Sequence, residues 1–495
     1  MKILSLFFLI IICFSLEAQE VKQIKIINTD NTFVNGKIHP EYWRLIGNVV
    51  FEHNRTIMKC DSAYHFSQTN KIIAFNNIRI TKGDSITLTG EKLNYDANKS
   101  YAKITGNVNF KNQSNILTTK EINFDLENDI IYFNEYGEIT DNEKKIISKK
   151  GYYQIKQKQY IFKDSVIVLA KDYTINTDNM KYNSLTEENI LEGPSMISID
   201  KKNIYCEQGI FNSKTKLAFL SKNTKIVDEK RIIYADSIYY DKKNKYAQAF
   251  KNVKIIDTIN SLNVFGENAE MFEVEKKIII SKNPVLCLIF DKDSLFVKGE
   301  KLININNKKS RIIQLFKNVR FFKNDLSGLC DSIVFSSEDS LISMYKNPFI
   351  WMEDYQISSD SIKLLFFNKK IEKIYLKSNP IIISKIDSID FNQIKGKEMI
   401  GYLKQNKIDK IDVLSNGESI YYLMEKDKKI GLNYIQATNL TLNFKNRKID
   451  NVSYKKIPNS ITTPYKDINE NQRFLNNFNW NLENKPKDKL EIIGS

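Results

Sequence analysis

Gly47-Asn48-Val49-Val50-Phe51 begins a pattern that returns about every 29 residues over most of the chain. Two early copies are Asn77-Ile78-Arg79-Ile80 and Gly106-Asn107-Val108-Asn109-Phe110. The later copies are Asp164-Ser165-Val166, Gly193-Pro194-Ser195, Asn223-Thr224, Asn252-Val253, Asn283-Pro284-Val285, Asn318-Val319, Asn347-Pro348-Phe349 and Asn379-Pro380-Ile381, and the series fades near Asn416-Gly417. Self-similarity at a fixed period of about 20–50 residues indicates one small structural unit stacked on itself many times.

A second motif lies about 13 residues after each copy of the first, and it reads small residue, acid, any residue, aliphatic, any residue, aromatic. Gly90-Glu91-Lys92-Leu93-Asn94-Tyr95 and Ala235-Asp236-Ser237-Ile238-Tyr239-Tyr240 are two examples, and Lys120 replaces the acid in a third copy. Apolar residues at every second position are typical of strands with one buried face. Asn, Asp, Gly and Pro at the joints favour turns. The sequence therefore predicts a unit of two strands and two turns.

The composition agrees with an all-β chain. The 495 residues include only 8 prolines, and Pro194, Pro284, Pro348 and Pro380 share one slot of the repeat. Proline cannot donate to a strand ladder, so this slot is expected at a strand start or a sheet edge. Amphipathic helical stretches are hard to find. We predict an all-β, elongated, solenoid-like stack of two-strand units with no linker that divides it.

The chain is basic, with a formal net charge of +15 and lysines spread along its length. A basic surface favours anionic partners such as nucleic acid, phospholipid headgroups or phosphorylated glycolipid. The alternative is that lysines on exposed strand faces keep a β-protein soluble. No cluster of Lys and Arg interleaved with aromatic residues is found, so nucleic acid is not expected as a partner.

The first residues are typical of a secretory signal peptide. A positive start, Met1-Lys2, precedes an almost continuously apolar run from Ile3 to Leu16, and Glu17-Ala18-Gln19 follows. This pattern predicts a signal peptide over residues 1–18, cleaved between Ala18 and Gln19. The run is too short for a comfortable membrane span. Export is the expectation, and retention of the segment as a membrane anchor is the alternative.

Residues that carry catalysis or bind metals do not converge in this sequence. Cys60, Cys206 and Cys330 occupy the small-residue slot of the second motif, where buried thiols are expected. His53 and His65 lie on successive predicted strands but lack further metal ligands. A catalytic site needs unlike residues that meet at one place, whereas this chain repeats like residues in columns. We therefore expect no enzymatic activity, no metal and no cofactor.

The aliphatic and aromatic positions of the second motif are expected to form continuous apolar stripes along the stack. The candidate lining residues are Leu93, Tyr95, Ile122, Phe124, Met180, Tyr182, Phe211, Ile238, Tyr240, Ile333, Phe335, Ile362 and Leu364. If two β-layers touch, the stripes form a closed core. If the layers splay apart, the same stripes line an apolar groove. The pattern leaves both alternatives open.

The ordered alternation of the two motifs behind a signal peptide resembles the OstA-like family, which includes the LptA-type lipopolysaccharide-transport proteins. Gly47-Asn48-Val49 and Gly106-Asn107-Val108 match its first motif, and Gly90-Glu91-Lys92-Leu93-Asn94-Tyr95-Asp96 and Ala235-Asp236-Ser237-Ile238-Tyr239-Tyr240-Asp241 match its second. The resemblance covers roughly residues 41–380 and weakens toward 455. The length and the aromatic tail around Trp480 resemble the long members found in Bacteroidetes-type bacteria.

The resemblance implies a folded-over β-jellyroll, a β-taco, whose apolar interior shields the acyl chains of lipopolysaccharide or a related glycolipid. It implies the periplasm of a Gram-negative bacterium, transfer of the lipid to the outer membrane, and partners among other envelope transport proteins. Edge strands would permit head-to-tail self-association.

On this basis the chain divides into a signal peptide (1–18), a lead-in (19–40), an OstA-like repeat region (41–300), a less regular continuation (301–457) and a polar tail (458–495). Three alternatives stay open. They are a membrane-anchored assembly factor of the same family, a structural or adhesive β-solenoid without lipid, and an enzyme acting on envelope polysaccharide.

Overall fold

The computed structural model describes residues 23–83, 86–113, 115–141, 143–290, 293–307, 310–367, 370–405, 407–445, 448–456 and 459–494. The expected signal peptide and its cleavage site at Ala18 and Gln19 lie outside these residues. The chain divides into two compact units, Met1–Glu192 and Gly193–Ser495, which we call unit 1 and unit 2.

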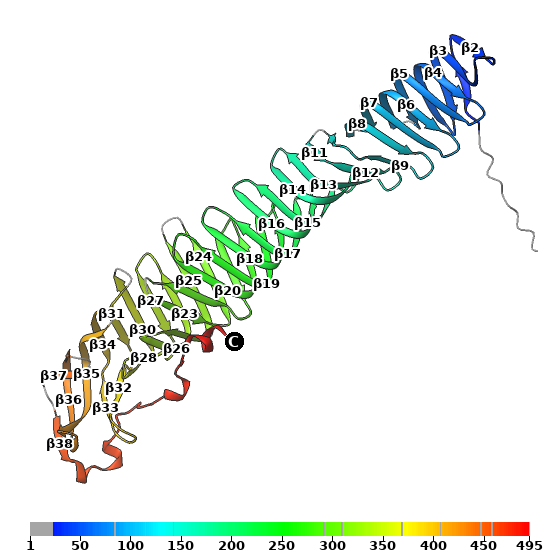
Figure 1. Ribbon diagram of the computed structural model, residues 1–495. Coiled ribbons are helices and arrows are strands. Elements are labelled where there is room, and N and C mark those ends of the chain that lie inside the picture. Colours follow the sequence, from blue (N-terminus) through cyan, green and yellow to red (C-terminus); the bar gives the residue numbers. More distant parts are fainter. Residues whose placement is uncertain are drawn as a thin grey trace, which may run out of the picture. The chain divides into compact units, whose positions relative to one another are not determined.

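The described residues fold almost entirely as strands, which confirms the all-β prediction (Figure 1). Unit 1 contains β1 (Lys25–Asn28), β2 (Asn31–Asn35), β3 (His39–His53), β4 (Thr56–Phe66), β5 (Lys71–Lys82), β6 (Ile86–Asp96), β7 (Tyr101–Asn112), β8 (Asn115–Asp125), β9 (Ile130–Phe133), β10 (Gly137–Thr140), β11 (Lys144–Ser148), β12 (Lys150–Gln154), β13 (Gln159–Ala170) and β14 (Tyr173–Asn183). The unit boundary falls within β15 (Glu188–Ile199).

Unit 2 is built in the same way and ends in short helices. Its strands are β16 (Lys202–Asn212), β17 (Leu217–Val227), β18 (Arg231–Asp241), β19 (Tyr246–Asp257), β20 (Leu262–Phe272), β21 (Lys277–Ser281), β22 (Val285–Ile289), β23 (Ser294–Lys298), β24 (Lys301–Asn306), β25 (Arg311–Lys323), β26 (Leu326–Ser336), β27 (Leu341–Tyr345), β28 (Phe349–Met352), β29 (Tyr355–Ser358), β30 (Ser361–Phe367), β31 (Lys370–Lys377), β32 (Ile381–Lys385), β33 (Phe391–Lys395), β34 (Glu398–Lys404), β35 (Lys407–Glu425), β36 (Lys428–Lys445), β37 (Lys448–Lys455) and β38 (Asn459–Pro464). The helices are η1 (Tyr465–Asp467), η2 (Glu470–Gln472), η3 (Leu482–Asn484) and α1 (Lys489–Ile493).

Each long strand is bent into two arms at the motif residues. In β5 the arm Lys71–Phe75 ends at Asn76-Asn77, and the antiparallel pairing with β6 is interrupted there before it resumes along Ile78–Lys82. Asn76 and Asn77 have φ of 61° and 47°, in the left-handed region that asparagine tolerates better than most residues. Two successive left-handed residues turn the strand sharply. We call the arm Lys71–Phe75 and its counterparts in other strands arm A, and the arm Ile78–Lys82 and its counterparts arm B.

The same corner recurs through both units, and it corrects our prediction of where the turns lie. Further left-handed pairs are Gly47-Asn48, Gly106-Asn107, Asp164-Ser165, Lys222-Asn223, Lys251-Asn252, Lys282-Asn283, Lys317-Asn318, Lys346-Asn347, Ser378-Asn379 and Ser415-Asn416. At most copies the first motif is a corner inside a strand, so the expectation of a joint between strands is wrong there. At Lys282-Asn283, Lys346-Asn347 and Ser378-Asn379 a new strand begins after the proline that follows the corner, as expected. The hairpin turns lie between the motifs, as at residues 97–100. The repeat unit is nevertheless two strands and two turns.

A ladder of hydrogen bonds joins the two motifs along the outside of the corners. The Asn107 side-chain amide donates to Glu91 Oε1 at 2.6 Å. Equivalent bonds join Asn77 to Asp61, Asn223 to Glu207, Asn252 to Asp236, Asn283 to Glu267, Asn318 to Glu300 and Asn379 to Asp360. In one copy the residue types are exchanged: Asp164 is at the corner and a lysine, Lys150, replaces the acid and pairs with it at 2.8 Å. The acid of the second motif thus accepts a hydrogen bond from the Asn of the following corner. It lies on the outside of that corner and does not enter the interior.

The small-residue slot before this acid lies on the inner side of the corner, where space is short. A Cβ added to Gly90 would lie 2.4 Å from Ile104 Cγ2. Cys60, Cys206 and Cys330 occupy this slot in other copies. These three and Cys287, which lies elsewhere in the repeat, are buried free thiols. Burial, with the nearby Asp61 charge, raises the pKa of Cys60 to about 12.

We expect these thiols to be inert in the folded protein. Nucleophilic attack requires the thiolate, and burial raises the pKa of Cys206 to about 11 and that of Cys330 to about 12. Treatment with a thiol-reactive chromogenic disulfide at pH 8 should release almost no colour until urea unfolds the chain. Rapid labelling of Cys206 in the native protein, located by peptide mass spectrometry, would contradict the closed corners.

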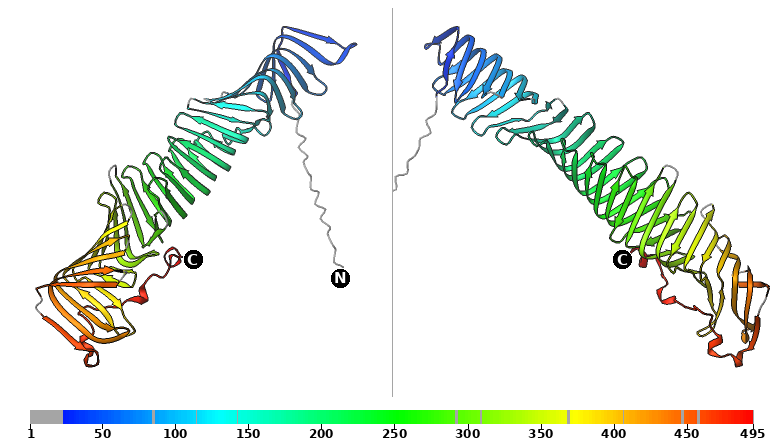
Figure 2. Two further views of the ribbon diagram at one scale, coloured as in Figure 1. Left: turned by 60° about the vertical axis from the view of Figure 1, so that its left-hand side comes forward. Right: turned by 180° about the vertical axis from the view of Figure 1, so that it is seen from behind.

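The C-terminal segment runs back along the outer face of arm B in unit 2 (Figures 1 and 2). Leu475 packs against Ile420, Tyr422 and Leu432, whereas Phe478 and Trp480 pack against a neighbouring cluster formed by Ile381, Ile383 and Phe391. The buried amides of Gln356 and Gln393 hold the backbone of the segment at Asn479, Asn481, Arg473 and Leu475. The segment covers an apolar outer face that the neighbouring strands would otherwise expose to water.

Candidate functional site

The inner face of arm A in unit 1 carries an unbroken row of mostly aromatic side chains. Strand register places the following residues side by side: Ile72, Tyr95, Ala102, Phe124, Ile131, Tyr153, Tyr160 and Tyr182. The Tyr153 and Tyr160 rings stack with centroids 4.2 Å apart. A second row closer to the corners contains Leu93, Ile104, Ile122, Phe162 and Met180. All of these side chains are buried.

Unit 2 repeats the arrangement over more strands. Its outer row, nearest the free ends of the arms, contains Phe211, Ala218, Tyr240, Ala247, Met271, Ile278, Asn304, Ile313, Phe335, Ile342 and Leu364. Its deeper row contains Leu220, Ile238, Ala249, Ala269, Ile280, Leu302, Leu315, Ile333, Met344 and Ile362. Every candidate lining residue named from the sequence falls in one of the rows of its unit and is buried.

Arm B folds over these rows, and its polar side chains meet the aromatic residues near the free ends of the arms. We call the line between the free ends of arm A and arm B the mouth. His53 Nδ1 hydrogen-bonds the Tyr95 hydroxyl, and Lys144 Nζ lies 3.8 Å from the centroid of the Tyr182 ring. Lys202 similarly lies 5.4 Å from the Tyr240 ring. Cations over aromatic faces are attracted by the ring quadrupole.

Ion pairs also cross the mouth. The pairs are Lys82 with Asp129 in unit 1, and Lys202 with Glu273 and Arg311 with Asp257 in unit 2. In each pair one residue lies at the end of arm A and the other at the end of arm B. Burial alone would lower the pKa of Lys202, but hydrogen bonds and charge from Glu273 and Tyr240 outweigh it and raise the pKa. The mouth is therefore bridged at intervals by charged groups.

The interior of unit 2 is hollow around both of its ion pairs. A cavity of about 830 Å³ extends from Lys202 to Arg311, with apolar walls that include Val264, Met271 and Leu302. An adjoining cavity of about 530 Å³ shares Arg311 and continues to Phe335 and Phe366. Ligand pockets in proteins typically measure about 300–1,000 Å³ and are mostly apolar with a few polar groups.

Sequence reasoning missed several residues of this interior. Tyr153 and Tyr160 were not named because β12 and β13 lack the regular second motif. Asn304 was missed although it shares the alternation phase of Leu302, which is the signal that places it on the inner face. Arg311 follows a polar stretch of the sequence and resembles the many exposed cations of this chain.

The described residues offer little other chemistry. Among them, no group of three or more His, Cys, Asp or Glu side chains is placed to hold a metal ion. His65 is buried, which lowers its pKa, and its ring packs against Trp43 and Phe51. No helix within the described residues has the length and apolarity to cross a membrane.

Comparison with known proteins identifies the family. No curated protein matches the chain. Among solved structures the chain is similar to LptH of Pseudomonas aeruginosa, the LptA-homologous periplasmic component of its lipopolysaccharide transport device. The identity is 16%, the TM-score is 0.20, and the match covers 22% of this chain and 81% of that chain. The model of the OstA-like proteins matches residues 21–178 and 183–285, more than half of the chain. The resemblance seen in the motifs is thus confirmed, and this chain belongs to the OstA-like family.

Proposed function

We propose that this protein is a periplasmic carrier of lipopolysaccharide or a related glycolipid, and that it shields the acyl chains between arm A and arm B during transfer to the outer membrane. The observation that carries the proposal is the mostly apolar interior of each unit, which in unit 2 widens into two cavities at the mouth. Each exposed methylene costs about 0.8 kcal/mol in water, so a carrier must offer apolar contact along the whole path. Membership of the OstA-like family supports the same assignment.

Loading requires the arms to part. The inner side chains are buried against each other, for example Tyr153 on Tyr160. An acyl chain that enters between the arms replaces these contacts with its own, so apolar surface stays out of water. The bridging ion pairs add to the cost of opening, most of all Arg311 and Asp257, whose side chains are only 13% and 12% exposed.

The proposal extends to partners. Among the described residues, β1 and β2 pair only with β3, and β37 and β38 pair only with β36. Each end of the repeat therefore presents strand edges, and an unpaired edge accepts a further strand. We propose head-to-tail self-association or docking of other envelope transport proteins at these edges.

Lipid extraction tests the carrier function. The full chain is exported in a Gram-negative host, purified without detergent, extracted with organic solvent and analysed by mass spectrometry. Glycolipid is expected with the wild type and with Tyr239→Asp, which changes an outward-facing side chain. It is expected to be lost with Ile238→Asp, which places a carboxylate on the fully buried inner face. No glycolipid in the wild type, or equal amounts in the two variants, would contradict the proposal.

One observation favours a second candidate function. All candidate lining residues are buried, and the mouth is bridged by ion pairs, which suits a structural or adhesive β-solenoid with a dry core. In that case the extract of the wild type contains no glycolipid, and Ile238→Asp changes stability alone.

A further inference from the structure

We infer that the cavity beside Arg311 and Asn304 binds the phosphate-bearing headgroup of an anionic amphiphile, whose hydrocarbon chain lies on the apolar wall of the same cavity. This inference rests on the proposed function and adds to it a headgroup site in unit 2. It also predicts that the headgroup carries hydroxyl or amide donors close to its phosphate.

The cavity is amphipathic. Its wall contains Ile255, Val264, Met271, Ile278, Ile280 and Leu302, which belong to the inner faces of both arms. Eight lysine or arginine residues and five acidic residues also line it. The excess of cations around the cavity attracts an anionic headgroup. The apolar wall suits contact with a hydrocarbon chain.

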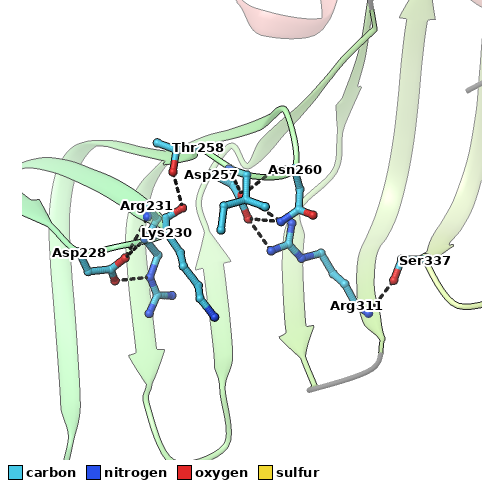
Figure 3. Close-up of polar contacts among 9 residues, drawn as sticks. Asp228, Lys230, Arg231, Asp257, Thr258, Asn260, Arg311 and Ser337 are labelled. Atoms are coloured by element: carbon cyan, nitrogen blue, oxygen red, sulfur yellow. Dashed lines mark hydrogen bonds and ion pairs between the residues drawn. The ribbon is translucent and has the colours of Figure 1, made fainter. Parts of the chain in front are cut away.

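Arg311 has unused binding capacity at this place. Its side chain is only 13% exposed, and one terminal nitrogen, Nη2, pairs with Asp257. The other, Nη1, is buried without a hydrogen-bond partner among the described residues. A guanidinium presents a planar fork of donors that matches two oxygens of a phosphate. Figure 3 shows Arg311 reaching from the start of β25 to Asp257 at the end of β19.

Asn304 supplies a second unused group in the same cavity. It is the polar member of an otherwise apolar row, between Ile278 and Ile313. Its Oδ1 atom is buried and lacks a hydrogen-bond partner among the residues described. Buried polar atoms are normally paired. An oxygen acceptor in the same cavity as a guanidinium donor fits a phosphorylated saccharide, which offers both hydroxyl donors and phosphate acceptors.

The Asp257 carboxylate competes with an incoming phosphate for the Arg311 guanidinium. Burial alone would raise the pKa of its carboxyl, but hydrogen bonds from the Asn260 backbone amide and from Arg311 outweigh it, so the pKa lies below its usual value. The ionised carboxylate pairs with one side of the Arg311 fork. An incoming phosphate that takes this position also releases a bridge across the mouth, which couples headgroup binding to opening.

Calorimetric titration of the full chain, purified without detergent, tests the inference. The probes are dodecyl phosphate, the neutral dodecyl maltoside and inorganic phosphate, all below micellar concentrations. Dodecyl phosphate should bind about tenfold or more tightly than dodecyl maltoside, since hydrogen bonds to charged groups are the stronger ones. Inorganic phosphate should bind much more weakly than dodecyl phosphate, because it has no chain for the apolar wall.

Three variants locate the effect. Arg311→Gln should weaken dodecyl phosphate binding about tenfold, and Asp257→Asn should tighten it, because the fork is released while the Asn260 contacts can persist. The matched control Arg320→Gln removes an arginine that pairs with Glu491 outside the cavity and should change nothing. The opposite signs of the first two variants exclude misfolding as the common cause.

Each contrary outcome overturns the inference. Equal binding of the phosphate and maltoside probes, or no effect of Arg311→Gln, leaves an apolar groove without a headgroup site, and the carrier function survives. Equal binding of inorganic and dodecyl phosphate indicates a site for free anions. Failure of both amphiphiles to bind removes the carrier function as well.

Discussion

Replacement of Asp390 by alanine is expected to lower the free energy of unfolding by about 3–5 kcal/mol, because breaking a buried ion pair leaves an uncompensated charge. The Asp390 side chain is 0% exposed, and it pairs with Lys429 and Arg473, which are 15% and 17% exposed. It also accepts a hydrogen bond from the Tyr465 hydroxyl at 2.9 Å. This carboxylate therefore ties the C-terminal segment to β33 and β36.

Urea unfolding at pH 7 measures this loss of unfolding free energy as a shift of the unfolding transition of unit 2 to lower urea concentration. The matched control is Asp409→Ala, which removes a surface pair with Lys404 whose side chains are 37% and 78% exposed. That control should cost about 0–1 kcal/mol. Hydrogen bonds from Lys429 lower the pKa of the neighbouring Asp387 to about 2. A carboxylate whose pKa is lowered by folding stabilises the folded state above about pH 4 and loses this effect as the pH falls through the lowered pKa. A measurement at pH 7 therefore captures the full effect. Equal losses in the two variants would contradict the buried network.

Covalent closure of the mouth is expected to abolish glycolipid loading. Lys202 and Glu273 pair across the mouth of unit 2, so cysteines at both positions, joined by a short bis-maleimide, would prevent the arms from parting. The capture of glycolipid by the full chain, measured by extraction and mass spectrometry, should fall to background after cross-linking.

The corner ladder provides the control for this experiment. Asn252 and Asp236 contact each other on the outside of a corner, so cysteines there join neighbouring strands without bridging the mouth. This cross-linked pair should load normally, as should each single-cysteine variant at 202 or 273. If the pair across the mouth loads as well as the corner pair, acyl chains do not enter where we propose.

Much of the fold follows from the repeat, but the corner does not. Alternation around Leu93 and Tyr95 predicts a strand with one buried face, and both side chains are buried on that face. The Asn in the first motif suggested a turn at a joint between strands, because asparagine favours turns and left-handed bends alike. Only the pairing of strands on both sides of Asn76-Asn77 reveals a bent strand.

The sequence contains a sign that an outer face is covered, but it does not show that the C-terminal segment covers it. Ile381-Ile382-Ile383 is a continuous apolar run, which indicates a strand buried on both faces. One face is the interior and the other is covered by Phe478 and Trp480. The sequence contains both partners, but nothing in their spacing indicates that they meet across about 100 residues. Arg311 and Asn304 were similarly hidden, because their significance comes from a cavity that forms between two arms.

Photocross-linking at adjacent tyrosines tests the central claim most directly. Tyr240 faces the interior and its neighbour Tyr239 faces outward near Tyr246. Tyr153 and Tyr152 form the same kind of pair in unit 1, because Tyr152 stacks on Tyr132. With a photoreactive phenylalanine at each position in living cells, glycolipid adducts are predicted at 240 and 153 and not at 239 and 152. Equal labelling within each pair, or labelling at the outward positions alone, would contradict an acyl-binding interior.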